Sequence, residues 1–177
     1  MSSSDLTRLK RRSLLALPLA LAACGFAPAY EKGGLTEGLF GTVRAADPDS
    51  KEAFAYVQRI EERLGRPERR LYDLDYTITT NSIGVGITSD NRTTRYNLEG
   101  RISYTLRNAA GEHLVTGTVQ SFTAFSATGS TVAMLAAEED ARVRLMRILA
   151  DQTVSRLMAE LAVLYKQGRI TAPVSAR

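Results

Sequence analysis

The sequence contains one cysteine, one histidine and no tryptophan among its 177 residues. A single cysteine cannot form an intramolecular disulfide, so the redox state of the compartment neither helps nor harms the fold. Cysteine and histidine are also too few to build a metal site from those ligands. His113 follows Gly111 and Glu112 in a predicted hairpin turn, where a histidine is normally solvated and lacks an oriented catalytic partner. These scarcities exclude a disulfide scaffold and a Cys/His metal centre, and they argue against histidine catalysis.

The chain also lacks a strong excess of either charge once its N-terminal segment is set apart. It has 23 basic and 19 acidic residues and a net charge of +4. Four of the basic and one of the acidic residues lie in residues 1–23, which leaves 19 basic and 18 acidic residues. A nucleic-acid-binding domain normally carries a clear basic excess. We therefore expect no nucleic-acid partner, and the 44% of hydrophobic residues is typical of an ordinary globular protein.

The N-terminus has the pattern of a secretory signal. Lys10-Arg11-Arg12 precedes an apolar stretch at residues 13–20, which is too short to span a bilayer. Leu21-Ala22-Ala23-Cys24 then resembles the bacterial lipobox. This resemblance implies that residues 1–23 are a cleaved signal peptide and that the Cys24 sulfur carries a diacylglycerol with palmitate-type chains. Two acyl chains suffice for stable anchoring, so we expect a lipid-anchored protein.

The residues on either side of the lipobox give information on the export route of the protein and on the membrane to which it is delivered. Arg11-Arg12 followed by Leu14-Leu15 is a partial twin-arginine pattern, so the twin-arginine and general secretory routes both stay open. Gly25 occupies the position at which an Asp commonly retains bacterial lipoproteins in the inner membrane. By analogy, we expect the outer membrane, with the protein facing the periplasm. Residues 24–38, rich in Gly, Pro and Ala, are interpreted as a spacer.

Hydrophobic periodicity predicts an α+β chain that begins with a strand and a helix. Residues 39–43 are predicted to form a short strand, and Asp47-Pro48 has the pattern of a helix start. Gly65 and Pro67 are expected to end this helix. Its apolar face is predicted from residues at helical spacing, namely Phe54, Val57, Ile60 and Leu64.

Alternation of apolar and polar residues predicts three antiparallel strands next. The first starts at Tyr72, and its apolar parity changes near Asn81, which predicts a bulge or tight turn there. A turn at 89–91 leads to the clearest strand, at 95–107, and a hairpin at 108–111 leads to the last strand. The change of parity is inferred from three apolar residues at odd-numbered positions, Ile83, Val85 and Ile87.

A long helix over residues 135–166 completes the predicted fold. Its apolar face is predicted to contain Val143, Met146, Ala150, Thr153, Leu157, Leu161 and Leu164. The whole is a two-layer sandwich, in which a mostly antiparallel sheet of about four strands packs against two helices. Residues 39–167 form this one domain, and residues 168–177 are expected to be a flexible tail.

No set of residues has the pattern of a catalytic site. Asp73 and Asp75 share one face of a strand, but this is the polar face of an amphipathic strand, where carboxylates are normally solvated. Gly84-Val85-Gly86 lacks the third Gly and the Lys-Ser/Thr pair of a phosphate loop. We therefore expect neither an enzyme nor a cofactor. Guanidinium groups suit phosphate, and the strand at 95–107 places three on its wet face, namely Arg95, Arg101 and Arg107.

Several segments in order resemble the LPS-assembly lipoprotein family, LptE. They span nearly the whole mature chain, although each one alone is a weak signal. The segments are Cys24-Gly25-Phe26 followed by Pro28 and Tyr30, Thr94-Arg95-Tyr96-Asn97-Leu98, Gly117 to Phe122, and the final helix with Glu138-Glu139-Asp140-Ala141 and Leu149-Ala150-Asp151-Gln152.

The resemblance implies a role without catalysis. Members of the family pair with the outer-membrane barrel LptD, sit in it as a plug, and help to place lipopolysaccharide in the outer leaflet. Basic loop residues of the family have been linked to lipopolysaccharide contact. Arg92 matches such a position here, whereas the loop at residues 126–133 carries no Lys or Arg. Phe122 and Phe125 fit either barrel contacts or the core, and we expect the core.

Two other functions compete with this interpretation. The chain could be an auxiliary lipoprotein of another envelope lipid-transport system, including a lipid carrier, which would need a deep apolar cavity. A periplasmic enzyme would instead need a cleft with perturbed acid–base groups. A plug is expected to have a filled core and a polar exterior.

Overall fold

Three long strands run as a meander and carry the rest of the fold. The computed structural model describes residues 39–89 and 92–170, so the predicted signal peptide, Cys24, the spacer and most of the predicted tail lie outside the described residues. Consecutive strands of the meander are antiparallel, and a short first strand pairs parallel to the second. The strands are β1 (Val43–Ala45), β2 (Tyr72–Ile87), β3 (Thr93–Asn108) and β4 (His113–Ser126), in that order across the sheet.

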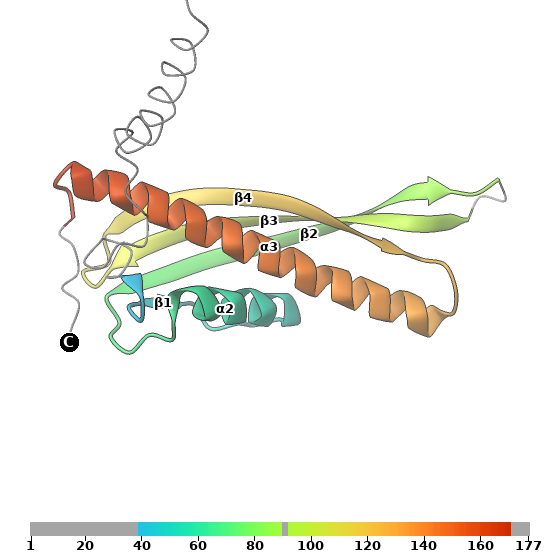
Figure 1. Cartoon of the computed structure of the whole chain (residues 1–177), viewed down its shortest axis with the longest axis horizontal. Helices are drawn as coiled ribbons and strands as arrows, with labels where there is room; N and C mark the ends of the chain where they lie inside the picture. The colour runs from blue at the N-terminus through green and yellow to red at the C-terminus, as the bar shows by residue number, and fades with distance from the viewer. Residues whose placement is uncertain (1–38, 90–91, 171–177) are drawn as a thin grey trace, which may run out of the picture. The chain divides into compact units, whose positions relative to one another are not determined.

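Two helices cover one face of this sheet and leave the other face open (Figure 1). They are α2 (Lys51–Leu64) and α3 (Thr131–Lys166). The predicted α+β two-layer sandwich is therefore confirmed, with one parallel pair in an otherwise antiparallel sheet. The first strand lies at 43–45 rather than at the predicted 39–43.

The parity change predicted at Asn81 is wrong. β2 continues through it in regular register, with Asn81 opposite Glu99, and the irregularities come later, on either side of Gly86. The apolar residues that suggested the change are simply exposed, at 41% for Ile83 and 65% for Ile87. Ile87 lies at the end of the β2–β3 hairpin, opposite Thr93, where β3 residues before Arg95 have no β4 partner, whereas Ile83 is opposite Asn97, within the three-stranded part of the sheet.

Helix α2 begins three residues later than the sequence predicted. Ser50, not Asp47, is the N-cap, and its hydroxyl accepts a hydrogen bond from the Ala53 backbone N–H at 3.1 Å. The predicted face is only half right, because Tyr56 is buried whereas Phe54 is 62% exposed. Ile60 lies six positions after Phe54, so at 3.6 residues per turn the two side chains point about 120° apart around the helix.

Helix α3 buries a wider stripe than the one predicted because it contacts both the sheet and α2. Its N-cap is Ser130, so the helix starts at Thr131, four residues before the predicted residue 135. Leu145, Leu149 and Val154 are fully buried, although the single predicted face omitted them. Polar contacts fix the pair of helices, since Arg142 binds Glu52 and Arg59 binds Asp151.

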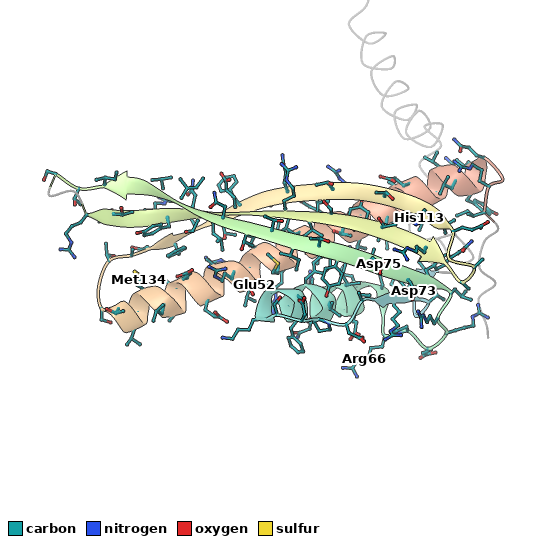
Figure 2. The ribbon with its side chains drawn as sticks, turned by 180° about the vertical axis from the view of Figure 1, so that it is seen from behind. Glu52, Arg66, Asp73, Asp75, His113 and Met134 are labelled. Atoms are coloured by element: carbon teal, nitrogen blue, oxygen red, sulfur yellow. The ribbon has the colours of Figure 1, made fainter. Side chains whose placement is uncertain are left out.

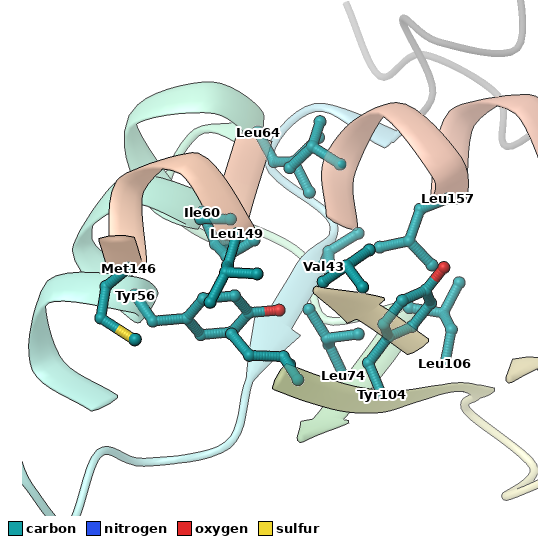
Figure 3. Packing of buried hydrophobic residues seen from close by; sticks show 14 of the residues in the cluster. Val43, Tyr56, Ile60, Leu64, Leu74, Tyr104, Leu106, Met146, Leu149 and Leu157 are labelled. Atoms are coloured by element: carbon teal, nitrogen blue, oxygen red, sulfur yellow. The ribbon is translucent and has the colours of Figure 1, made fainter. Parts of the chain in front are cut away.

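Two glycines on the buried face of the sheet leave room for large core side chains, one from α3 and one from the neighbouring strand. A Cβ on Gly100 would lie 2.9 Å from side-chain carbons of both Leu145 and Leu149. A Cβ on Gly117 would lie 2.5 Å from the Tyr104 hydroxyl oxygen. The space between the layers is thus filled by Leu and Tyr side chains packed onto bare backbone, and Figure 3 shows this core around Tyr56, Leu74 and Tyr104.

Side chains of α3 hydrogen-bond to the edge strand β4. β4 contains no Lys, Arg, Asp, Glu or Pro, the residues that usually protect an edge strand from pairing with another chain. Two arginines of α3 occupy its outward carbonyls instead. Arg156 donates to the Thr118 carbonyl at 2.8 Å, and Arg144 donates to the Ala124 carbonyl at 3.3 Å.

Removal of both guanidinium groups is expected to promote edge-to-edge association. The double variant Arg144→Ala/Arg156→Ala leaves the carbonyls of an uncharged strand available to a second chain, so we expect more dimer in sedimentation velocity as concentration rises. Arg147→Ala, on the same helix and exposed, is the matched control and should stay monomeric. Equal association of the two variants would show that the edge is not protected in this way.

Candidate functional site: the open face of the sheet

The face of the sheet opposite the helices is mostly polar, with exposed apolar side chains at Phe122 and, toward the β2–β3 hairpin, at Ile83. Figure 2 shows the molecule from behind with its side chains. Odd-numbered residues of β2 and β3 and even-numbered residues of β4 point to this face, because the even positions of β3 are buried against the helices. Residues that lie opposite one another on β2, β3 and β4 form rows across this face, and the strand register shows which residues share a row. Two of these rows carry hydroxyls, with Ser103 Oγ 3.4 Å from Thr118 Oγ1 and Thr105 Oγ1 3.4 Å from Thr116 Oγ1.

The three arginines predicted on the wet face of β3 do lie there but form no basic cluster. They are six residues apart, which is roughly 20 Å along a strand. Arg107 pairs with Asp75 at 2.8 Å, and Arg101 donates to the Gln120 side-chain oxygen at 3.1 Å. Their positive charges are thus spread and partly neutralised, so this face is not built to hold a phosphate.

The two carboxylates on β2 are likewise held in ion pairs. Arg70 contacts both oxygens of Asp73, at 2.6 and 2.8 Å, and this guanidinium lowers the pKa of the Asp73 carboxyl. Asp75 is paired with Arg107, as above. A lowered pKa keeps Asp73 ionised at neutral pH, so it cannot serve as a general acid there. The contribution of its ion pair to stability is lost only as the pH falls below the usual pKa of an aspartate toward the lowered pKa of the folded state.

Arg92 lies at the end of the β2–β3 hairpin. Its backbone is held by Thr88, whose N–H donates to the Arg92 carbonyl at 3.0 Å, and its side chain is exposed. The exposed Ile87 precedes it in the same hairpin. The loop before α3 is tied to the start of β3 by a hydrogen bond from the Ala127 N–H to the Thr94 carbonyl at 2.8 Å, and it adds no cation.

The prediction for the two phenylalanines of β4 is right for one and wrong for the other. Phe125 is 7% exposed and stacks on Tyr96 with ring centroids 5.3 Å apart. Phe122 is 65% exposed on the open face, opposite Glu99. The parity of β4 could have shown this, since Phe122 shares its parity with Thr116, Thr118 and Gln120.

Within residues 39–89 and 92–170, no group of three or more His, Cys, Asp or Glu side chains could hold a metal ion. His113 is the first residue of β4 and is exposed. No helix in these same ranges is both long enough and apolar enough to cross a membrane. The candidate site consists of the open sheet face and the end of the β2–β3 hairpin.

Comparison with known proteins adds a family and a fold. Residues 40–157 match the family described as LptE, lipopolysaccharide-assembly. A lipoprotein structure from Caulobacter crescentus is similar with a TM-score of 0.62 and 16% identity, covering 75% of this chain and 98% of that one. Rare lipoprotein B from Shewanella oneidensis is similar with a TM-score of 0.56 and 9% identity, covering 70% and 97%. At such identities the structures show the fold alone, and no curated protein matches the sequence.

Proposed function

The chain belongs to the LptE family of lipopolysaccharide-assembly proteins, and from this premise we propose that it plugs the barrel of the lipopolysaccharide translocon. In this role the protein is an outer-membrane lipoprotein that faces the periplasm. It pairs with an LptD-like β-barrel, supports its assembly, and assists insertion of lipopolysaccharide into the outer leaflet. It makes and breaks no covalent bond of the lipid.

The observation that best supports a plug is a filled core beneath a polar exterior. A water-filled barrel lumen accepts a body with a polar surface. The open face offers hydroxyl rows such as Ser103–Thr118, while Leu145 and Leu149 pack directly on Gly100 inside. A lipid carrier of another transport system would need an apolar cavity where these side chains lie, which disfavours the alternative.

Anchoring is proposed to come from Cys24. Diacylglycerol on its sulfur would hold the domain at the inner leaflet while the domain itself stays in water. The lipobox Leu21-Ala22-Ala23-Cys24 supports this part of the proposal.

The test is purification of the full-length, lipidated protein from detergent-solubilised outer membrane, with partners identified by mass spectrometry. We expect a large β-barrel in roughly equal amount that persists in high salt, because a large buried interface depends little on screened surface charge pairs. A Cys24→Ala variant is the control, and it should lose acyl labelling and membrane fractionation. Recovery of the protein alone, or with inner-membrane transporter subunits, would refute the plug and favour an auxiliary lipoprotein.

Lipopolysaccharide contact is proposed at Arg92, where an exposed guanidinium follows the exposed Ile87 in the hairpin. A cation beside apolar surface suits an anionic lipid. Arg92→Ala is expected to weaken binding of purified lipopolysaccharide several-fold. Arg66→Ala is the control, because Arg66 is 89% exposed in the connection after α2 and should leave binding unchanged. Equal affinities of both variants would remove Arg92 from the contact.

A further inference from the structure

A hollow of about 470 Å³ lies on the open face of the sheet, across β2, β3 and β4. Its side chains come from two consecutive cross-strand rows, in which Asn81 is opposite Glu99 and Glu99 is opposite Phe122, while Thr79 and Gln120 flank Arg101. Rows on one face are about 7 Å apart and three strands span about 10 Å, which is wide enough for one or two sugar rings. The side chains that line it are Thr79, Asn81, Glu99, Arg101, Gln120 and Phe122.

Phe122 differs from an ordinary exposed apolar residue because of what surrounds it. Single exposed apolar side chains are common and need no function. Phe122, however, is 65% exposed and lines a hollow whose other side chains are hydrogen-bonding groups. In the row next to that of Phe122, the side chains are held in place by a hydrogen bond that Arg101 donates to the Gln120 side-chain oxygen at 3.1 Å. An aromatic face beside amides, a carboxylate and a guanidinium is a mixed surface with both apolar and polar binding capacity.

The charge of the hollow selects a neutral partner. It holds one carboxylate, Glu99, and one guanidinium, Arg101, so its formal charge is zero. Glu99 would repel a phosphate, and a purely apolar ligand would bury both charges without hydrogen bonds. A neutral ligand with many hydroxyls satisfies both groups. Sugars have this chemistry, because their hydroxyls donate and accept while one ring face presents only C–H groups.

We propose that this hollow binds a neutral stretch of an oligosaccharide, with the C–H face of one ring on Phe122. Glu99 accepts from ring hydroxyls, Arg101 donates to them, and the amides of Asn81 and Gln120 do both. The chain of sugars continues along the hydroxyl row of Ser103 and Thr118, where the face stays uncharged. Sugar binding is expected of the isolated protein, so its test does not depend on the barrel partnership.

Two envelope glycans share this chemistry, and the experiment separates them. The full-length protein in detergent is titrated with two probes by saturation-transfer NMR and calorimetry. One probe is a neutral hexose oligosaccharide of the kind found in the outer core of lipopolysaccharide, and the other is N,N′-diacetylchitobiose, a neutral model of the peptidoglycan backbone. We expect one of them to bind, and the one that binds identifies the source.

Two matched variants decide whether the hollow is the site. Phe122→Ala should weaken binding about tenfold, as loss of an aromatic contact does. Phe54→Ala removes a ring of nearly equal exposure, 62%, from α2 and should leave the affinity unchanged. Unchanged thermal unfolding of both variants establishes that the fold is intact. Absence of binding by both glycans, or equal affinity of Phe122→Ala and wild type, would overturn the proposal without bearing on barrel co-purification.

Discussion

Replacement of Leu149 by alanine is expected to lower the free energy of unfolding by about 3 kcal/mol. Leu149 is fully buried on α3, and one of its methyl carbons would lie 2.9 Å from a Cβ built on Gly100. Truncation there removes apolar contacts on both the sheet side and the helix side. The surrounding side chains cannot collapse into the space, because the sheet backbone beneath them is already rigidly paired.

Leu135→Ala is the matched control on the same helix. Leu135 is 57% exposed, so its truncation should change stability by only about 0.5 kcal/mol. Urea unfolding followed by circular dichroism measures both variants. Losses of similar size would mean that the layer between α3 and the sheet is not the main core.

Replacement of Gly117 by alanine is expected to lower the free energy of unfolding by about 2 kcal/mol, through overpacking rather than through a cavity. The added methyl would meet the Tyr104 hydroxyl oxygen at 2.5 Å and the carbon that bears it at 2.6 Å. Tyr104 is only 2% exposed and its ring is enclosed by the core, so it cannot rotate away freely. Either the ring or β4 must shift.

A double variant tests this mechanism. Tyr104→Leu shortens the side chain over Gly117, so Gly117→Ala combined with Tyr104→Leu should cost clearly less than the sum of the two single changes. A coupling of about 1 kcal/mol in thermal or urea unfolding is the expected size for residues in contact. Additive losses would place the strain of the alanine elsewhere.

The sequence was most informative for long strands and helices, in which apolar and polar residues recur at a fixed period. Alternation between residues 72–79 and 95–107, the hairpin at 108–111 and the long helix were all predicted, because a strand or helix repeats its environment at a fixed period. The family resemblance was likewise confirmed by the match over residues 40–157. The strands, the hairpin, the long helix and the family motifs can all be read from residues that are close together in the sequence.

Periodicity could not decide which of several apolar residues were covered. Phe54 was expected in the core and lies in solvent, while Tyr56 took the buried place. Ile83 and Ile87 suggested a change of face at Asn81, yet the strand is regular there and both residues are exposed. A period shows which residues share a face and leaves open whether anything packs on that face.

The sequence by itself determined the order of elements and the α+β class. Only the tertiary structure decided the partners of the charged residues, such as Arg107 with Asp75, and the helix arginines that guard the β4 edge. It also decided that Gly100 and Gly117 are contact points and that Phe122 belongs to an open polar hollow. The physical reason is that these contacts join residues far apart in the chain, from 13 positions for Tyr104 and Gly117 to 49 for Gly100 and Leu149. Strand register and helix placement, rather than local spacing, set such neighbours.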